Sequence, residues 1–233
     1  MNLVLTGIST ALVVGLASAI VNADRREVGQ VIFSPPVVSA PLLGLVLGNS
    51  LIGLQVGAVF GLLWIGKQGC GTRKAPNDSL AAMACVGASV ISGASAAAVG
   101  ASMLLSVPLA RIGGMLDLRR ERKNIDLGEI VYNAEGSEWN GILAKTLARG
   151  VFRSAVEGLI FGTIATLMIG TIVSLVCKFV PPSLNQSFKD IPALLPACAA
   201  GCALAAMPGK SPAVVFIIAA LCLALYSFLW GFV

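Results

Sequence analysis

Charged residues divide the chain into long apolar segments. Residues 2–23 form the first of them, and residues 31–66 and 79–110 carry no charge over 36 and 32 positions. As single helices the latter two would be roughly 50 Å long, against a bilayer hydrocarbon core of ~30 Å. Each is therefore predicted to fold back on itself. Further apolar segments follow at residues 154–177, 191–207 and 213–233.

The uncharged run 34–66 is a poor sequence for one continuous helix. It contains three prolines, at positions 35, 36 and 41, and a Gly-Asn-Ser break at 48–50. Proline interrupts helical hydrogen bonding, and irregular backbone at membrane depth is tolerated only where protein or water surrounds it. The pattern predicts a re-entrant arm at 36–47, followed by a short helix at 51–66.

The second half of the chain repeats this irregularity. Pro192 and Pro196 are predicted to open a short segment that Pro208 and Gly209 close. Paired broken segments in two halves are typical of transporters built from repeats. The fold class predicted is an all-α polytopic membrane protein with re-entrant or broken segments, compatible with an inverted repeat. We expect one membrane domain over residues 1–233, with halves at 1–110 and 154–233.

Residues 111–153 between these halves hold most of the charge. They include a basic cluster, Arg119, Arg120, Arg122 and Lys123. Because Lys and Arg in short loops favour the cytoplasmic side, this loop is predicted to be cytoplasmic. Two interpretations remain open, namely a solvated connector and a docking surface for soluble partners.

Composition supports a location within a bilayer. The 233 residues are 57% hydrophobic and only 12% charged, whereas soluble domains carry roughly 25% charged residues. The net charge of +5 does not indicate nucleic acid binding, since the basic residues lie between apolar spans. The N-terminal segment could be a secretory signal, but it lacks a positive leading region and is long enough to span, which favours a retained first helix.

Enzymatic chemistry has little support in the residue types. The chain contains no histidine, which excludes histidine catalysis, phosphohistidine and most transition-metal sites. No catalytic residue, metal site or cofactor is predicted. Five of the six cysteines lie in apolar runs, where cysteine acts as a small hydrophobe. Only Cys70, near Lys67 and Arg73, has the cationic neighbours that make a thiol reactive.

Polar residues near the breaks are the candidate substrate ligands, because amides and acids can match the hydroxyls of an uncharged sugar. Asp78 is the strongest, since a carboxylate can accept two hydroxyl donors. It could instead cap a helix starting at Ser79. Glu157 could form an intrahelical ion pair with Arg153, but an acid within a span is a functional candidate by default. The full set is Gln30, Ser34, Asn49, Gln55, Asn77, Asp78 and Glu157.

Small residues recur every four positions, a spacing that lets membrane helices approach closely. These stripes exceed what the predicted spans can use internally, so we expect a membrane partner or an oligomer. The stripes are Gly53, Gly57 and Gly61; Ser89, Gly93, Ala97 and Ala101; and Ala197, Gly201 and Ala205.

The run "SPPVVSAPLLGLVLGNSLIGLQVGAVFGLLWIG", followed by "APNDSLAA", resembles component C of the mannose/fructose/sorbose-type bacterial phosphotransferase system. That family has a proline-led run ending in Leu-Gly-Asp, a helix with Thr-Gly-x-x-x-Gly, and a Pro-Pro-Asp loop. The matching positions here are 36–49, 52–57 and 76–78. Pro35, Asn49 and Gly61 stand where the family usually has Arg, Asp and Glu.

The resemblance implies a sugar-translocating subunit in the bacterial inner membrane. Component C works with a homologous membrane component D, and cytoplasmic components A and B phosphorylate the sugar. Component C itself carries no phosphorylated residue and is not an enzyme. The alternative hypothesis is a non-transporting scaffold or regulator, derived from such a subunit, that docks cytoplasmic components through residues 111–153.

Overall fold

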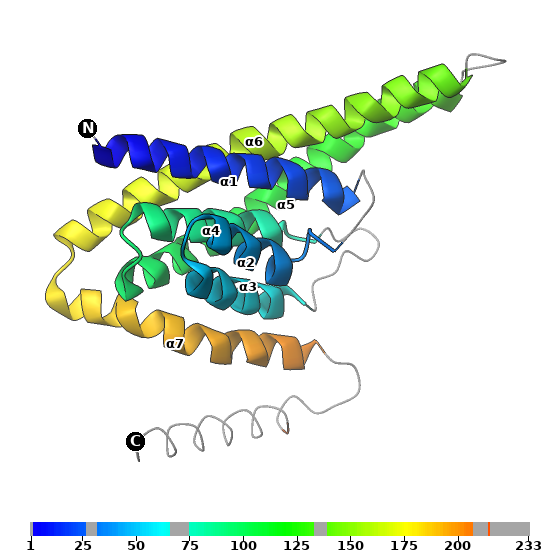
Figure 1. Ribbon diagram of the computed structural model, residues 1–233. Helices are drawn as coiled ribbons and strands as arrows, with labels where there is room; N and C mark the ends of the chain where they lie inside the picture. The colour runs from blue at the N-terminus through cyan, green and yellow to red at the C-terminus, as the bar shows by residue number, and fades with distance from the viewer. Residues whose placement is uncertain (1, 27–31, 66–74, 133–138, 207–213, 215–233) are drawn as a thin grey trace.

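The computed structural model of the chain describes residues 2–26, 32–65, 75–132, 139–206 and 214, and within these ranges it contains helices and no strand (Figure 1). The predicted all-α class is confirmed. The helices are α1 (Asn2–Arg26), α2 (Pro36–Val46), α3 (Ser50–Trp64), α4 (Asp78–Ile91), α5 (Ala96–Tyr132), α6 (Trp139–Phe179) and α7 (Pro182–Ala205).

Four of these helices, α1, α5, α6 and α7, are long and apolar enough to cross a membrane. Large apolar side chains recur every four residues on the outside of α1, at Ile8, Leu12, Leu16 and Ile20, and all are exposed. The opposite face of α1 packs along α6 through Gly15, Gly158 and Gly162. One apolar face toward neighbouring helices and another toward the surroundings is the pattern of a helix in lipid. The chain is a polytopic membrane protein.

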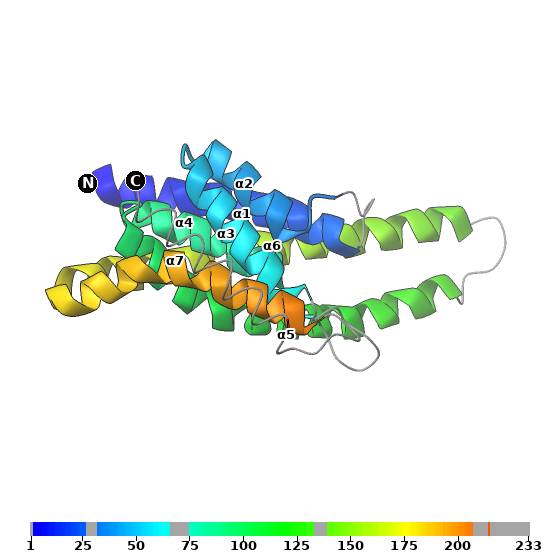
Figure 2. The ribbon, with the colours of Figure 1, turned by 90° about the horizontal axis from the view of Figure 1, so that it is seen from below.

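Helices α2 and α3 form the predicted hairpin, broken where the sequence indicated. The turn closes with hydrogen bonds from Gly48 N to Leu45 O and from Asn49 N to Gly44 O, and Gly48 has φ of 72°. At ~1.5 Å per residue the helices are roughly 16 and 22 Å long, too short to cross ~30 Å. The start of α2 and the end of α3 lie at the same end of the bundle (Figure 2).

The uncharged run 79–110 also folds back as predicted. Helix α4 ends at Ile91 and α5 begins at Ala96, with Gly93 at φ of 90° and Ala94 at φ of 55° between them. The small residues Ser89, Gly93, Ala97 and Ala101 therefore do not form one helical stripe, because the turn separates them.

The expected break at Pro192 and Pro196 is wrong, since α7 continues through both. Proline lacks the N–H that would bond to the carbonyl four residues earlier. Other helices cover both carbonyls left open in this way. Gln55 Nε2 donates to Pro192 O at 2.9 Å, and Gly100 of α5 lies directly against Phe188 O. Pro208 and Gly209 lie outside the described residues.

Residues 111–153, expected as a connecting loop, are mostly helical. Helix α5 extends to Tyr132 and α6 starts at Trp139, so the two form a charged hairpin that projects beyond the bundle (Figure 1). We call residues 119–132 and 139–153 the charged hairpin. Most of its basic side chains are exposed, namely Arg119, Arg122, Lys123, Lys145 and Arg149, whereas Arg120 is buried.

Candidate functional site

Four helix ends converge at the end of the bundle from which the charged hairpin projects. Helix α1 ends there, α3 ends there, and α2 and α4 begin there (Figures 1 and 2). Between them lies a cavity of about 360 Å³, within the roughly 300–1,000 Å³ range of small-molecule sites. Its lining is Arg25, Ser34, Pro35, Pro36, Val37, Gly61, Trp64, Ile65, Ala75, Pro76 and Asp78.

The loop at residues 75–78 forms the polar wall of this cavity. Asn77 is the N-cap of α4, because its Oδ1 accepts from Leu80 N at 3.1 Å. Its own N–H donates to Ala110 O of α5 at 2.8 Å. Asp78 is thus the first residue of α4, and the alternative that Asp78 caps a helix starting at Ser79 is wrong. Asp78 instead places a carboxylate in the first turn, where the helix dipole favours it.

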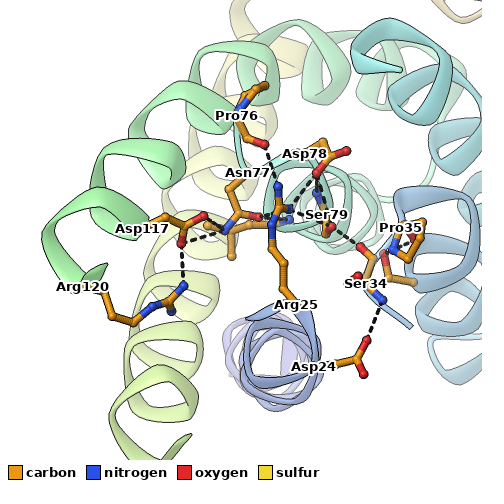
Figure 3. Close-up of polar contacts among 12 residues, drawn as sticks. Asp24, Arg25, Ser34, Pro35, Pro76, Asn77, Asp78, Ser79, Asp117 and Arg120 are labelled. Atoms are coloured by element: carbon orange, nitrogen blue, oxygen red, sulfur yellow. Dashed lines mark hydrogen bonds and ion pairs between the residues drawn. The ribbon is translucent and has the colours of Figure 1, made fainter. Parts of the chain in front are cut away.

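Arg25, at the end of α1, holds this loop in place (Figure 3). Its NH1 lies 2.8 Å from Asp78 Oδ1, 3.2 Å from Asn77 Oδ1 and 3.3 Å from Ser79 Oγ. Its NH2 donates to Pro76 O at 2.9 Å. Both members of the ion pair are largely buried, with 14% of the Arg25 side chain and 24% of the Asp78 side chain exposed. Sequence reasoning missed Arg25 because a basic residue ending a span has the spacing of an ordinary orientation signal.

The ion pair leaves hydrogen-bonding capacity toward the cavity. Asp78 Oδ2 makes no hydrogen bond within the part of the chain that the structure describes, whereas Oδ1 also accepts from Ser79 N at 3.0 Å. Nε–H of Arg25 takes no part in its four bonds. A carboxylate acceptor beside a guanidinium donor, in a cavity also lined by Trp64 and Val37, suits a neutral molecule with neighbouring hydroxyls and an apolar face.

Ser34 also lines the cavity and is fixed through its backbone. Its N–H donates to Asp24 Oδ2 at 3.1 Å, and its carbonyl accepts from the Ser79 hydroxyl. The structure therefore brings Ser34 close to Asn77 and Asp78, although they come from two separated segments.

Glu157 lies behind this loop and not in the main cavity. The predicted ion pair with Arg153 is present, at 3.4 Å. Glu157 lines a narrow crevice on the other side of Asn77, together with Asn22, Asp117 and Arg120. Glu157 and Asp78 therefore line two different openings.

Asn49 and Gln55 do not join the cavity. Asn49 lies in the α2–α3 turn, away from the start of α2, and its Nδ2 donates to Leu47 O at 3.1 Å. Gln55 is bonded to Pro192 O in α7. Neither residue lines the cavity. Gln30 lies outside the described residues. Within those residues there is no group of three or more His, Cys, Asp or Glu side chains that could hold a metal ion.

Comparison with known proteins shows the family of this chain. The family described as "PTS system sorbose-specific iic component" matches residues 8–230, nearly the whole chain. The chain belongs to this family. It is a phosphotransferase-system membrane component of the sorbose-specific IIC type, as the sequence resemblance implied.

Other comparisons add the fold and no further function for this IIC component. A solved structure described only as "Structure of membrane protein" matches with a TM-score of 0.66 and 18% identity, covering 93% of this chain and 94% of that one. At this identity the likeness shows the fold alone. A search of curated proteins gave no significant match.

Proposed function

We propose that this IIC component is the sugar-translocating subunit of a mannose-family phosphotransferase system, and that the sugar binds in the cavity beside Asp78. The cavity geometry carries this proposal. An unmatched hydroxyl moved out of water costs roughly 1–3 kcal/mol, so a sugar site must supply partners. Asp78 Oδ2 and the Arg25 guanidinium supply an acceptor and a donor side by side.

The ion pair also favours a neutral ligand over a charged one. Arg25 and Asp78 neutralise each other at 2.8 Å, and Asp24 is bonded to Ser34 at the rim. A charged sugar would have to break this pair or remain unpaired in a largely buried site, which is costly. A neutral monosaccharide needs neither.

Charge distribution supports a cytoplasmic location for the cavity end. The charged hairpin and Arg25 lie at that end, whereas Lys178 lies in the last turn of α6, at the opposite end. Lys and Arg favour the cytoplasmic side of the bacterial inner membrane. The cavity in this conformation then opens on the side where cytoplasmic components A and B would phosphorylate the sugar.

A membrane component D is the proposed partner of this subunit. Among the described residues, only 11% of the membrane-length part of α7 is buried, which leaves much of its surface available to a membrane partner. The stripe Gly53, Gly57 and Gly61 does not serve such a partner, because all three residues pack against α2.

The first test compares Asp78→Asn and Asp78→Ala with the parent, reconstituted in nanodiscs. Removing a charge-assisted hydrogen bond is worth ~1.5–3 kcal/mol, so Asp78→Ala should weaken binding of the family's sugars (sorbose, mannose and fructose) roughly tenfold or more. Asp78→Asn should be milder. The matched control is Asp190→Asn, an exposed acid on α7 outside the cavity. Calorimetry gives the affinity, and thermal melts of the same samples show whether stability alone has changed.

The scaffold alternative makes a different prediction. The departures at Pro35, Asn49 and Gly61 support it, since Pro35 and Gly61 line the cavity where the family usually has charged residues. In cells lacking other mannose-family permeases, this subunit with its components D, A and B should sustain phosphorylation of an added sugar. A scaffold would bind components A and B but give no sugar phosphate, and would bind none of the three sugars.

A further inference from the structure

The buried residues Asp117 and Arg120 of α5 form a unit outside the sugar cavity that the proposed function does not use. They lie 2.9 Å apart, with 4% and 2% of their side chains exposed, at the point where the charged hairpin leaves the bundle. Taking two charges out of water costs several kcal/mol, and the pair need not stabilise the fold more than apolar residues would. The contacts of the pair therefore indicate whether it has a role besides stabilising the fold.

Three helices meet at this ion pair. Arg120 NH1 donates to Ser154 Oγ of α6 at 2.8 Å, and Ser154 Oγ donates in turn to Asn22 O of α1 at 3.2 Å. Asn22 Nδ2 donates back to Ser154 O at 2.9 Å. The guanidinium is thus hydrogen-bonded to α6 at the residue that contacts α1, and it holds the Asp117 carboxylate in one position.

The Asp117 carboxylate faces the loop that carries Asp78 (Figure 3). Asn77 Nδ2 lies 3.4 and 3.5 Å from its two oxygens. This contact fixes the Asn77 amide so that Oδ1 points to Leu80 N and to Arg25. Arg25 then holds Asp78 from the other side. The order of contacts is Arg120, Asp117, Asn77, Arg25 and Asp78, which ends at the cavity.

Two glycines of α5 allow its backbone to lie close to the same loop. Added Cβ atoms at Gly113 and Gly114 would lie 2.8 Å from Asn77 Cβ and 3.1 Å from Ala75 O. With Asn77 N bonded to Ala110 O at 2.8 Å, this turn of α5 touches the loop along its length. Residues 110–120 of α5 therefore form the surface on which the loop packs, and the ion pair lies at the polar end of that surface.

We propose that Asp117 and Arg120 are positioning residues for sugar binding, which hold the Asn77 amide and, through Arg25, orient the Asp78 carboxylate. The proposal rests on the proposed function for its effect on sugar affinity. Its effect on the loop itself does not depend on any sugar.

The decisive variant replaces both charges with apolar residues, Asp117→Leu with Arg120→Met. Because no charge is left buried alone, this double variant should keep the parent's melting temperature or exceed it. It nevertheless removes the acceptor of Asn77. Hydrogen–deuterium exchange of the parent and the variant in nanodiscs should show backbone amides 77–80 exchanging roughly five- to tenfold faster, with α2 and α3 unchanged. A purely structural pair predicts unchanged exchange in the loop.

Two single variants keep the test decisive if the double variant does not fold. Asp117→Asn preserves shape and should raise the exchange of the same amides by a smaller factor. Arg119→Gln, an exposed neighbour on the same helix, should change nothing. Unchanged loop exchange in folded Asp117→Asn would overturn the proposal.

Sugar affinity separates this proposal from the proposed function. Binding of sorbose, mannose and fructose should weaken roughly fivefold or more in the double variant at parental stability. If the parent binds none of the three, the sugar-site proposal fails, while loop exchange still decides the role of Asp117 and Arg120. If the parent binds sugar and the double variant binds equally well, the positioning role fails.

Discussion

The close contact of α2 and α3 gives a prediction whose size can be worked out from the structure. At Gly53 an added Cβ would lie 2.5 Å from Ala40 O, 3.0 Å from Gly44 Cα and 3.0 Å from Pro41 Cα. All three are backbone atoms, so no side chain can rotate away. Restoring ordinary contact at 3.4 Å requires α2 to move by roughly 0.9 Å.

Gly53→Ala should therefore destabilise the protein. Overpacking of this kind typically costs ~1–3 kcal/mol, and the better helix propensity of alanine returns about 1 kcal/mol. Gly150→Ala on α6 is the matched control, because an added Cβ there meets nothing within 4 Å. It receives the helix benefit alone, so the two variants should differ by about 1–3 kcal/mol in free energy of unfolding.

Thermal melts in one detergent measure this difference. At about 2–4 °C per kcal/mol for a chain of this size, Gly53→Ala should melt roughly 2–12 °C below Gly150→Ala. If the two variants have the same melting temperature, α2 and α3 do not pack as closely as described, and the cavity that they help to form has a different shape.

Three further variants test other parts of the structure. Gln55→Leu should lower the free energy of unfolding by ~1 kcal/mol, because it leaves Pro192 O without a donor. In a chain that also carries Pro196→Ala, the restored helical N–H should bond to Pro192 O and remove that cost. A double variant whose change in melting temperature equals the sum of the two single changes would refute the explanation. A cysteine replacing Gly141 in the charged hairpin, in a chain lacking its native cysteines, should be labelled in intact cells only by a membrane-permeant reagent, and labelling by an impermeant one would reverse the orientation. Arg25→Gln should weaken sugar binding about as much as Asp78→Asn in the same calorimetry, and unchanged affinity would remove Arg25 from the site.

Local chemistry made the breaks predictable from sequence. Gly48 and Asn49 favour a tight turn, and Pro36 fits the first turn of α2, so the hairpin at 36–64 depends mainly on nearby residues. The turn between α4 and α5 followed from length alone, because 32 uncharged residues exceed one crossing.

Features that depend on distant residues could not be read in this way. Helix α7 continues through Pro192 because Gln55 and Gly100, from two other helices, lie against the open carbonyls. The pairing of Arg25 with Asp78 joins residues 53 positions apart. The sequence thus placed Asp78 and Asn77 among the candidates, but it could not show that Arg25 joins them and that Asn49 and Gln55 do not.

A structure of the subunit with sugar bound tests the central claim most directly. Sorbose, mannose or fructose, whichever binds most tightly in calorimetry, would be added at saturation to the protein in nanodiscs. The account predicts sugar density in the cavity between α1, α2, α3 and the 75–78 loop, with a hydroxyl within hydrogen-bonding distance of Asp78 Oδ2. Density elsewhere, such as beside Asn49 at the α2–α3 turn, with the cavity empty, would contradict it.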